Sequence, residues 1–277
     1  MAGDALQRID GSLMAREWLV IALLLPVAAG AQSTSEGAGE IECEATIGGI
    51  EAERLAGYCY EQFVSHAAPD AELPLVIALH WSTSTPAEFL PHVMGLQQPA
   101  RVIMPQGPYP KKAGYSFYPA SPNYYGLPAD EQLPRMLHEA DRLSAFISAV
   151  SRKYPSSMKP VLMGASQGGD LSYAIAIRNP DKISLAIPLL ATIDERLIGR
   201  APASAVAVRA FHGADDRIVP LAQAGRHVAV LAAAGHDARL RAYPGAGHDI
   251  PADMQRDYLQ TIDRHLSTQA LSVERKP

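Results

Sequence analysis

A serine flanked by glycines, at residues 164–168 (GASQG), constrains the fold of this chain more than any other stretch. An apolar run at residues 160–163 precedes it, and residues 170–177, which suit a helix, follow it. The order predicts a strand, a tight turn and a helix, with the Ser166 hydroxyl exposed above the end of the strand. Taken alone, the pattern also fits a glycine-rich connection without chemistry, so its meaning depends on the rest of the sequence.

The composition indicates a globular protein. Of the 277 residues, 48% are hydrophobic and 19% are charged, which suffices for a sizeable core. No linker rich in serine, glycine or proline interrupts the middle, so we expect residues 41–277 to form a single α/β domain. The net charge of −5, with no basic cluster, argues against a nucleic-acid partner.

The N-terminal region has the features of a secretory signal peptide. The apolar run at residues 18–27 is too short to span a bilayer, and residues 29–31 (AGA) form an A-x-A-like cleavage site. We therefore expect a signal peptide over residues 1–31, with Met14 as the true start because acidic residues precede it. Residues 32–40 would form a disordered leader. The mature protein would be exported, periplasmic or secreted, without stable membrane insertion; an uncleaved membrane anchor is the alternative.

Cys43 and Cys59 are the only cysteines. In an exported chain their proximity predicts a disulfide, which would add about 3 kcal/mol by restricting the unfolded chain. Two unpaired thiols are the alternative. No histidine or further cysteine stands at ligand spacing beside either residue, so we expect no metal and no cofactor.

Strands and helices alternate along the rest of the chain. This alternation predicts a doubly wound, mostly parallel sheet covered on both faces. An antiparallel hairpin, formed by residues 40–47 and 58–64, is expected to precede it. The expected strands are residues 73–79, 101–104, 160–163, 183–187, 206–211 and 239–243, and the longer expected helices are residues 133–154, 170–177, 222–234 and 253–266.

A long connection at residues 106–132 contains six aromatic residues and no clear strand or helix. Loops of this length inside a compact domain are usually functional. The aromatic side chains either pack the loop onto the surface or, in the case of Tyr115 and Tyr118, line a substrate cleft. The sequence favours neither interpretation.

Two later strand ends carry the groups that a serine nucleophile requires. A serine hydroxyl needs a base, and the base needs an orienting carboxylate. Asp215 and Asp216 follow the strand at residues 206–211, and His248 follows the last strand. Ligands bind beyond the carboxyl ends of the strands in such sheets. With Ser166, these residues occur in the order Ser, Asp, His, which is the order in an α/β-hydrolase.

From about Leu73 to the C-terminal helix, the chain resembles the phospholipase/carboxylesterase, dienelactone-hydrolase-like group of α/β-hydrolases. The resemblance implies that Asp216 is the triad acid, because it fits the D-x-x-V-P position, with Asp215 as the fallback. It also implies that His248 is the base, at the G-H position before the last helix. The matching pieces are LPLVIALH, MPQGPYP, LMGASQGGDLSYAIAIRNP, FHGADDRIVP and YPGAGHDIP.

Two backbone N–H groups are expected to form the oxyanion hole. One belongs to Gln167, the residue after the nucleophile, and the other to the loop after the strand at residues 73–79. Members of the family commonly have His-Gly in this loop, followed by the donor. Here the loop reads His80-Trp81-Ser82. The resemblance therefore implies Ser82 as the second donor, while Trp81 replaces the usual glycine and shapes the acyl pocket.

The segment at residues 189–205 leaves no room for a large cap domain, so we expect an open site that suits small soluble esters. The predicted activity is serine-dependent hydrolysis of carboxylic esters through an acyl-enzyme. No Walker, dinucleotide or zinc-protease pattern is present. One alternative is a depolymerase or feruloyl-esterase-like enzyme acting on polymeric or plant esters. The other is a non-catalytic binding module on a hydrolase scaffold. The sequence does not indicate an oligomeric state.

Overall fold

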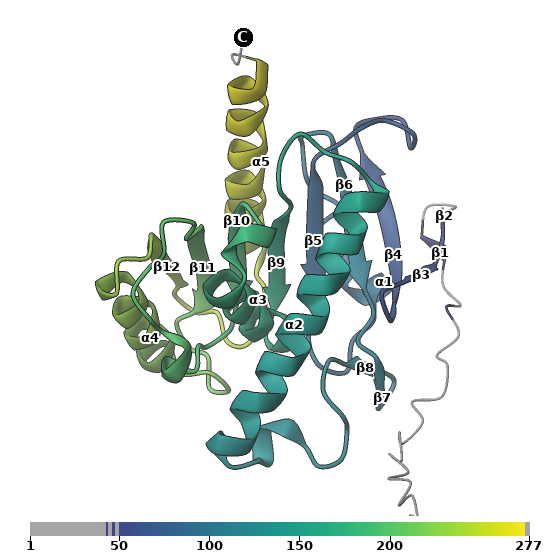
Figure 1. Ribbon diagram of the computed structural model, residues 1–277. Coiled ribbons are helices and arrows are strands. Elements are labelled where there is room, and N and C mark those ends of the chain that lie inside the picture. Colours follow the sequence, from purple (N-terminus) through teal and green to yellow (C-terminus); the bar gives the residue numbers. More distant parts are fainter. Residues whose placement is uncertain (1–42, 44–45, 48–49, 275–277) are drawn as a thin grey trace, which may run out of the picture. The chain divides into compact units, whose positions relative to one another are not determined.

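The structure is a computed structural model that describes residue 43, residues 46–47 and residues 50–274 (Figure 1). The predicted signal peptide, the start at Met14 and the predicted leader lie outside these residues. In the described part of the chain, no helix has both the length and the apolar character needed to cross a membrane.

An eight-stranded sheet forms the centre of the domain (Figure 1). Six neighbouring strands are parallel, and the last two strands at one edge run antiparallel to their neighbours. The strand order reverses at β5, which lies between β9 and β6, as in doubly wound folds. In spatial order the strands are β12 (Ala238–Tyr243), β11 (Ala207–Gly213), β10 (Leu185–Leu189), β9 (Val161–Ala165), β5 (Leu75–Leu79), β6 (Ala100–Pro105), β4 (Tyr58–Ser65) and β3 (Glu53–Leu55).

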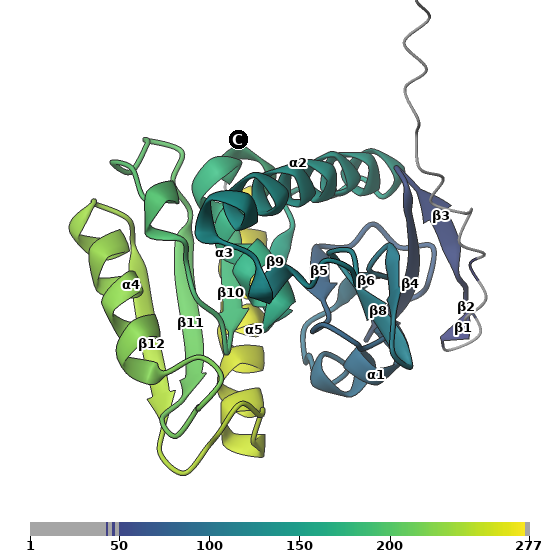
Figure 2. The same cartoon turned by 90° about the horizontal axis from the view of Figure 1, so that it is seen from below.

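Helices cover both faces of this sheet (Figure 2). Two separate apolar clusters result, because the central strands are buried on both sides. The first cluster lies under α2 (Ala129–Lys153), α3 (Gln167–Arg178) and α4 (Leu221–Ala233), and the second lies under α1 (Pro86–Phe89) and α5 (Ala252–Glu274). The predicted α/β-hydrolase fold with a mostly parallel sheet is confirmed, and residues 50–274 contain no large cap.

The N-terminal antiparallel hairpin is present, but its first strand is not the expected one. Among the described residues, β4 pairs with β3 on one side and with β6 on the other. The connection between the two strands is the dipeptide Ala56-Gly57, with φ angles of +47° and +84°. A two-residue turn of this kind needs positive φ at both positions and matches the twist of the strands. β1 (Thr46–Ile47) instead pairs with β2 (Ile50–Glu51).

The disulfide predicted between Cys43 and Cys59 is present, with the two Cα atoms 5.4 Å apart. Cys59 lies in β4, and it is buried. The bond therefore links Cys43 to an interior strand of the sheet.

The connection at residues 106–132 is more ordered than the sequence indicates. It forms a hairpin of β7 (Tyr109–Lys111) and β8 (Gly114–Ser116), and a short 3₁₀ helix at Tyr124–Gly126. The following helix, α2, begins at Ala129, four residues before the expected start. Asp130 and Glu131 in its first turn favour this start, because acidic groups stabilise helix N-termini.

Candidate active site

Ser166 lies at the turn between β9 and α3, where the backbone is strained. Its φ of +51° and ψ of −113° are unusual for a residue with a side chain, and such conformations cost about 1–3 kcal/mol. The Ser166 N–H donates to the Leu189 carbonyl at 2.9 Å, and the Ser166 carbonyl accepts from the Asp170 N–H at 2.9 Å. β10 and the first turn of α3 therefore hold the strained residue in place.

The glycines of the GASQG motif are required by the close approach of backbone to backbone. A Cβ on Gly164 would lie 2.3 Å from the Gly168 carbonyl oxygen. A Cβ on Gly168 would lie 2.4 Å from the Leu79 carbonyl oxygen, at the end of the neighbouring strand β5. These contacts make the turn tight enough to bring Ser166 to the carboxyl edge of the sheet, which is the end at which the parallel strands terminate.

Ser166, His248 and Asp216 form a continuous hydrogen-bonded row. The distance from Ser166 Oγ to His248 Nε2 is 3.0 Å, and the distance from His248 Nδ1 to Asp216 Oδ2 is 2.7 Å. Asp216 is buried, and its Oδ1 accepts the N–H groups of Ile218 and Val219 at 2.8 and 2.9 Å. Both carboxylate oxygens are thus engaged, which fixes the orientation of the imidazole.

Asp215 does not contact the imidazole and serves another purpose. It is exposed, and its Oδ2 accepts the Gly245 N–H at 2.9 Å in the turn that precedes His248. The loop is held close to β11 as well, because a Cβ on Gly213 would lie 2.0 Å from the Gly247 carbonyl oxygen. Asp215 and Gly213 therefore position the loop that carries the histidine.

Two buried histidines hold backbone segments of the site together. His80 Nδ1 lies 2.7 Å from the Trp81 carbonyl oxygen, and His80 Nε2 accepts the Gly107 N–H at 2.9 Å. Burial lowers the pKa of His80 to about 4, so the ring is neutral and its proton is on Nδ1. Burial also lowers the pKa of His212, whose Nε2 donates to the Val219 carbonyl at 2.8 Å.

The loop that contains Ser82 is supported by the β7–β8 hairpin. The Thr83 N–H donates to the Tyr115 carbonyl at 2.7 Å, and the Tyr115 N–H donates to the Ser84 carbonyl at 2.9 Å. A Cβ on Gly114 would lie 2.4 Å from the Thr83 carbonyl oxygen. Tyr115 therefore contributes through its backbone, a role that the sequence does not reveal.

The two predicted oxyanion donors differ in their environment. Gln167 is the first residue of α3, so its N–H has no acceptor within the helix. Its side chain is buried and accepts the Phe117 N–H at 2.7 Å, which fixes its position. The Ser82 N–H donates to no backbone carbonyl among the described residues, and so neither amide has a backbone acceptor.

Comparison with known families identifies the chain. The model of the dienelactone hydrolase family matches residues 129–272, which is more than half of the sequence. The chain belongs to the dienelactone hydrolase family. It is accordingly a carboxylic ester hydrolase. No curated protein sequence matches the chain significantly.

Solved structures share the fold of this dienelactone hydrolase family member at low sequence identity. The esterase PE8 is 21% identical with a TM-score of 0.63, and the match covers 75% of this chain and 99% of PE8. A carboxylesterase from Bacillus cereus is 16% identical with a TM-score of 0.60, covering 74% and 94%. Acyl-protein thioesterase 2 from Zea mays is 17% identical with a TM-score of 0.57, covering 74% and 98%.

Two cavities of the family member reach Ser166. The first, of about 410 Å³, is largely apolar. Trp81 and Ser82, which the sequence predicts near the nucleophile, both line it. Trp81 packs edge-on against Phe89, with ring centroids 5.6 Å apart. The other residues that line this first cavity are His92, Ala165, Leu190, His248, Asp249 and Ile250.

The second cavity, of about 460 Å³, has a more polar lining that includes Tyr124, Tyr125 and Asp170. Tyr115 and Tyr118, which the sequence analysis considers as cleft residues, line neither cavity. Tyr118 is buried and stacks on Tyr124, with ring centroids 3.8 Å apart. The aromatic connection thus reaches the site, but through Tyr124 and Tyr125.

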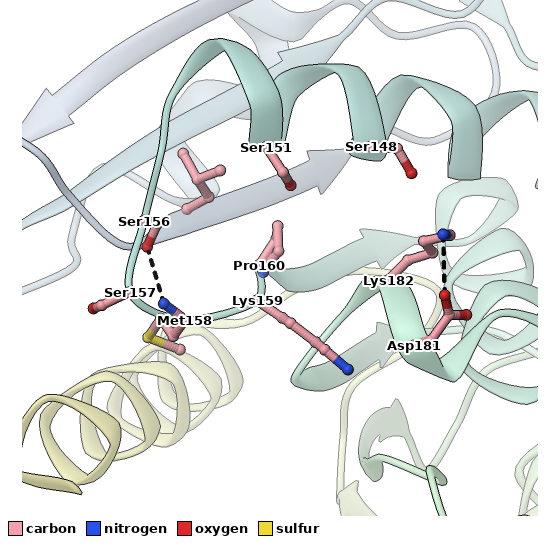
Figure 3. Close-up of a pocket in the computed structure, with 10 residues that line it drawn as sticks. Ser148, Ser151, Ser156, Ser157, Met158, Lys159, Pro160, Asp181 and Lys182 are labelled. Carbon is pink, nitrogen blue, oxygen red and sulfur yellow. Dashed lines mark hydrogen bonds and ion pairs between the residues drawn. The ribbon is translucent and has the colours of Figure 1, made fainter. Parts of the chain in front are cut away.

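A further cavity, of about 400 Å³, lies at the amino edge of the sheet, which is the end at which the parallel strands begin (Figure 3). Several serines line it together with Lys159, Asp181 and Lys182. Lys182 Nζ lies 3.0 Å from Asp181 Oδ2, and Ser156 Oγ accepts the Met158 N–H. The described residues that line this cavity include no histidine, so its serines have no base of the kind that Ser166 has.

Proposed function

We propose that Ser166, His248 and Asp216 form the catalytic triad of a serine esterase that works through an acyl-enzyme. The proposal rests on two consecutive hydrogen bonds. The distance from Ser166 Oγ to His248 Nε2 is 3.0 Å, and the distance from His248 Nδ1 to Asp216 Oδ2 is 2.7 Å. A base within hydrogen-bond reach of the nucleophile, itself oriented by a carboxylate, is the arrangement that this chemistry needs.

In this mechanism, Ser166 Oγ attacks the ester carbonyl while His248 Nε2 takes the hydroxyl proton. The tetrahedral intermediate collapses when His248 gives this proton to the leaving alcohol, and an acyl-serine remains. Water then attacks the acyl-serine with His248 again as the base, which releases the acid and restores Ser166. Asp216 keeps the His248 proton on Nδ1 in the resting state and stabilises the imidazolium when it forms.

The N–H groups of Gln167 and Ser82 would bind the developing oxyanion. Their lack of carbonyl partners among the described residues supports this role, because donors that are already placed and unpaired need no rearrangement during the reaction. The His80 hydrogen bonds to Trp81 and Gly107 would keep the Ser82 loop in position.

The size and linings of the two cavities support a small ester as the substrate. A cavity of about 410 Å³ and one of about 460 Å³ are at the lower end of the range for small-molecule sites. We also propose that the protein is exported after removal of residues 1–31, which leaves residues 41–277 as one domain behind a short leader. The Cys43–Cys59 disulfide supports export, since such bonds persist in oxidising compartments.

Labelling with a fluorophosphonate probe tests the triad directly. The purified protein should gain one probe adduct, located on the peptide that contains Ser166, and should hydrolyse p-nitrophenyl acetate. The Ser166→Ala variant should neither be labelled nor turn over the ester. A folded protein that shows neither labelling nor turnover would instead favour a binding module on a hydrolase scaffold.

A further inference from the structure

The second cavity contains a buried carboxyl group that the proposed triad does not use. Asp170 is only 5% exposed and, like Ser166, it lines this cavity. The Asp170 N–H donates to the Ser166 carbonyl at 2.9 Å, so the two residues are adjacent at the first turn of α3. A substrate bound to Ser166 and extending into the second cavity would therefore meet Asp170.

The hydrogen bonds of Asp170 leave part of its carboxyl free. Oδ1 accepts the Thr192 N–H at 2.9 Å, and Oδ2 accepts the Tyr125 hydroxyl at 3.1 Å. A carboxylate has about four acceptor positions, so about two remain. Among the described residues, no lysine, arginine or histidine lies at ion-pair distance from Asp170.

Such a group weakens the fold. Burial raises the pKa of Asp170 to about 7, because the charged form loses its hydration without gaining a cation. A neutral residue at this position would avoid that cost. Destabilising polar groups of this kind concentrate at functional sites, where the fold tolerates them for their chemistry.

Other side chains that line the second cavity can also form hydrogen bonds with a polar ligand. Gln132, Gln223 and Thr192 line it beside Asp170. Asp194, the other carboxylate in the lining, is already paired with Arg196. Asp170 is thus the acidic group in this lining that has no cationic partner. The first cavity has a more apolar lining, and the carboxylate that borders it, Asp249, is exposed to solvent.

We propose that Asp170 is a specificity-determining residue, whose carboxyl accepts a hydrogen bond from a hydroxyl group on the part of the ester that occupies the second cavity. The proposal rests on the function proposed above, and it names hydroxylated esters as the substrate class. A site built to receive a hydroxyl discriminates strongly against the analogue that lacks it, because the acceptor is then left buried and unpaired.

Matched esters test this assignment. One pair, 2-hydroxyethyl butyrate and propyl butyrate, places the hydroxyl in the alcohol part. The other pair, ethyl 3-hydroxybutyrate and ethyl 3-methylbutyrate, places it in the acyl part. For the native protein, kcat/KM should favour the hydroxylated member of at least one pair by about tenfold or more. The pair that shows the preference identifies the part of the ester held in the second cavity.

In Asp170→Ala this preference should fall by about tenfold, and Asp170→Asn, which keeps one acceptor oxygen, should retain part of it. Asp194→Asn, in the same cavity but altering a paired carboxylate, should leave the preference unchanged. Equal kcat/KM ratios in the native protein and Asp170→Ala for both pairs would overturn the proposal. Fluorophosphonate labelling at Ser166 and p-nitrophenyl acetate turnover are measured on every variant. Failure of the triad would remove both signals from the native protein, whereas failure of this inference would leave them intact.

Discussion

The two edges of the central sheet carry cavities of nearly equal size, about 410 Å³ at the carboxyl edge and about 400 Å³ at the amino edge. Both are lined by serine, yet the serines differ. At the amino edge, the hydroxyls of Ser148 and Ser151 donate to the carbonyls of Ser144 and Ile147 in their own helix. At the carboxyl edge, Ser166 lies in a strained turn beside an imidazole. Strain and placed partners, and not volume, distinguish the candidate active site.

The largest expected effect separates the serines of the two edges. Ser166→Ala should reduce kcat for p-nitrophenyl acetate by about 10⁴-fold or more, because the nucleophile is lost. Ser151→Ala, at the amino edge, should leave kcat and KM unchanged. Steady-state kinetics on both variants provide the check. An equal loss of kcat in the two variants would contradict the assignment of Ser166 as the nucleophile.

A second contrast lies within the carboxyl edge. Asp216→Asn should lower kcat by about 10³-fold or more, since the amide can no longer hold the productive tautomer of His248. Asp215→Asn, which alters only the bond to the Gly245 N–H, should lower kcat less than about fivefold. Kinetics at pH 7.5 would decide between the two acids, and a larger loss in Asp215→Asn would reverse the assignment.

Close packing at the carboxyl edge predicts an effect on stability. Gly168→Ala should destabilise the fold by about 3 kcal/mol, because the new Cβ would lie 2.4 Å from the Leu79 carbonyl oxygen. Gly225→Ala, in α4, meets nothing within 4 Å and should stabilise by up to about 1 kcal/mol through helix propensity. Urea unfolding measures both free energies, and similar values for the two variants would show that the turn can relax.

The smallest expected effect is a pH-dependent one. The folded-state pKa of Asp170 is raised from 3.8 to about 7, so the fold loses stability as the pH rises through this window. Relative to the native protein, Asp170→Asn should therefore be about 2 kcal/mol more stable at pH 8 and about 2 kcal/mol less stable at pH 4. A three-unit shift represents roughly 4 kcal/mol between these pH values, and the amide loses about 2 kcal/mol at either pH because it accepts fewer hydrogen bonds.

Asp181 at the amino edge provides the control for this measurement. It is exposed, and the neighbouring Lys182 lowers its pKa. Asp181→Asn should change the unfolding free energy by less than about 0.5 kcal/mol, since exposed ion pairs contribute little. Thermal unfolding at pH 4 and pH 8 tests both variants. A gain at pH 8 that is no larger for Asp170→Asn than for Asp181→Asn would contradict the assigned cost of burial.

The contrast between the two edges also shows which residues of the candidate site could be predicted from the sequence. Ser166, Asp216 and His248 could be located because each follows an apolar run that predicts a strand, and strand ends of a parallel sheet meet at one edge. Trp81 and Ser82 could be located for the same reason. These predictions rest on local patterns and on one rule of topology.

Features that depend on contacts between residues far apart in the sequence were not predicted. An acidic residue in the first turn of a helix is ordinary, so nothing local marks Asp170, whose burial involves Thr192. The support of the Ser82 loop by the β7–β8 hairpin rests on contacts between Thr83 and Gly114. The pairing of β3 with β4 escaped because its turn, Ala56-Gly57, lacks the Asn-Gly or Asp-Gly pattern that is typical of two-residue hairpins.

The sequence separation of 82 between Ser166 and His248 has a consequence for biosynthesis. The nucleophile turn needs β9, β5 and β10, all of which precede residue 190, whereas His248 follows β12, the last strand among the described residues. A nascent or truncated chain that ends before β12 carries the serine without its proposed base. The proposed triad can therefore form only after translation has passed residue 248 and β12 has joined the sheet.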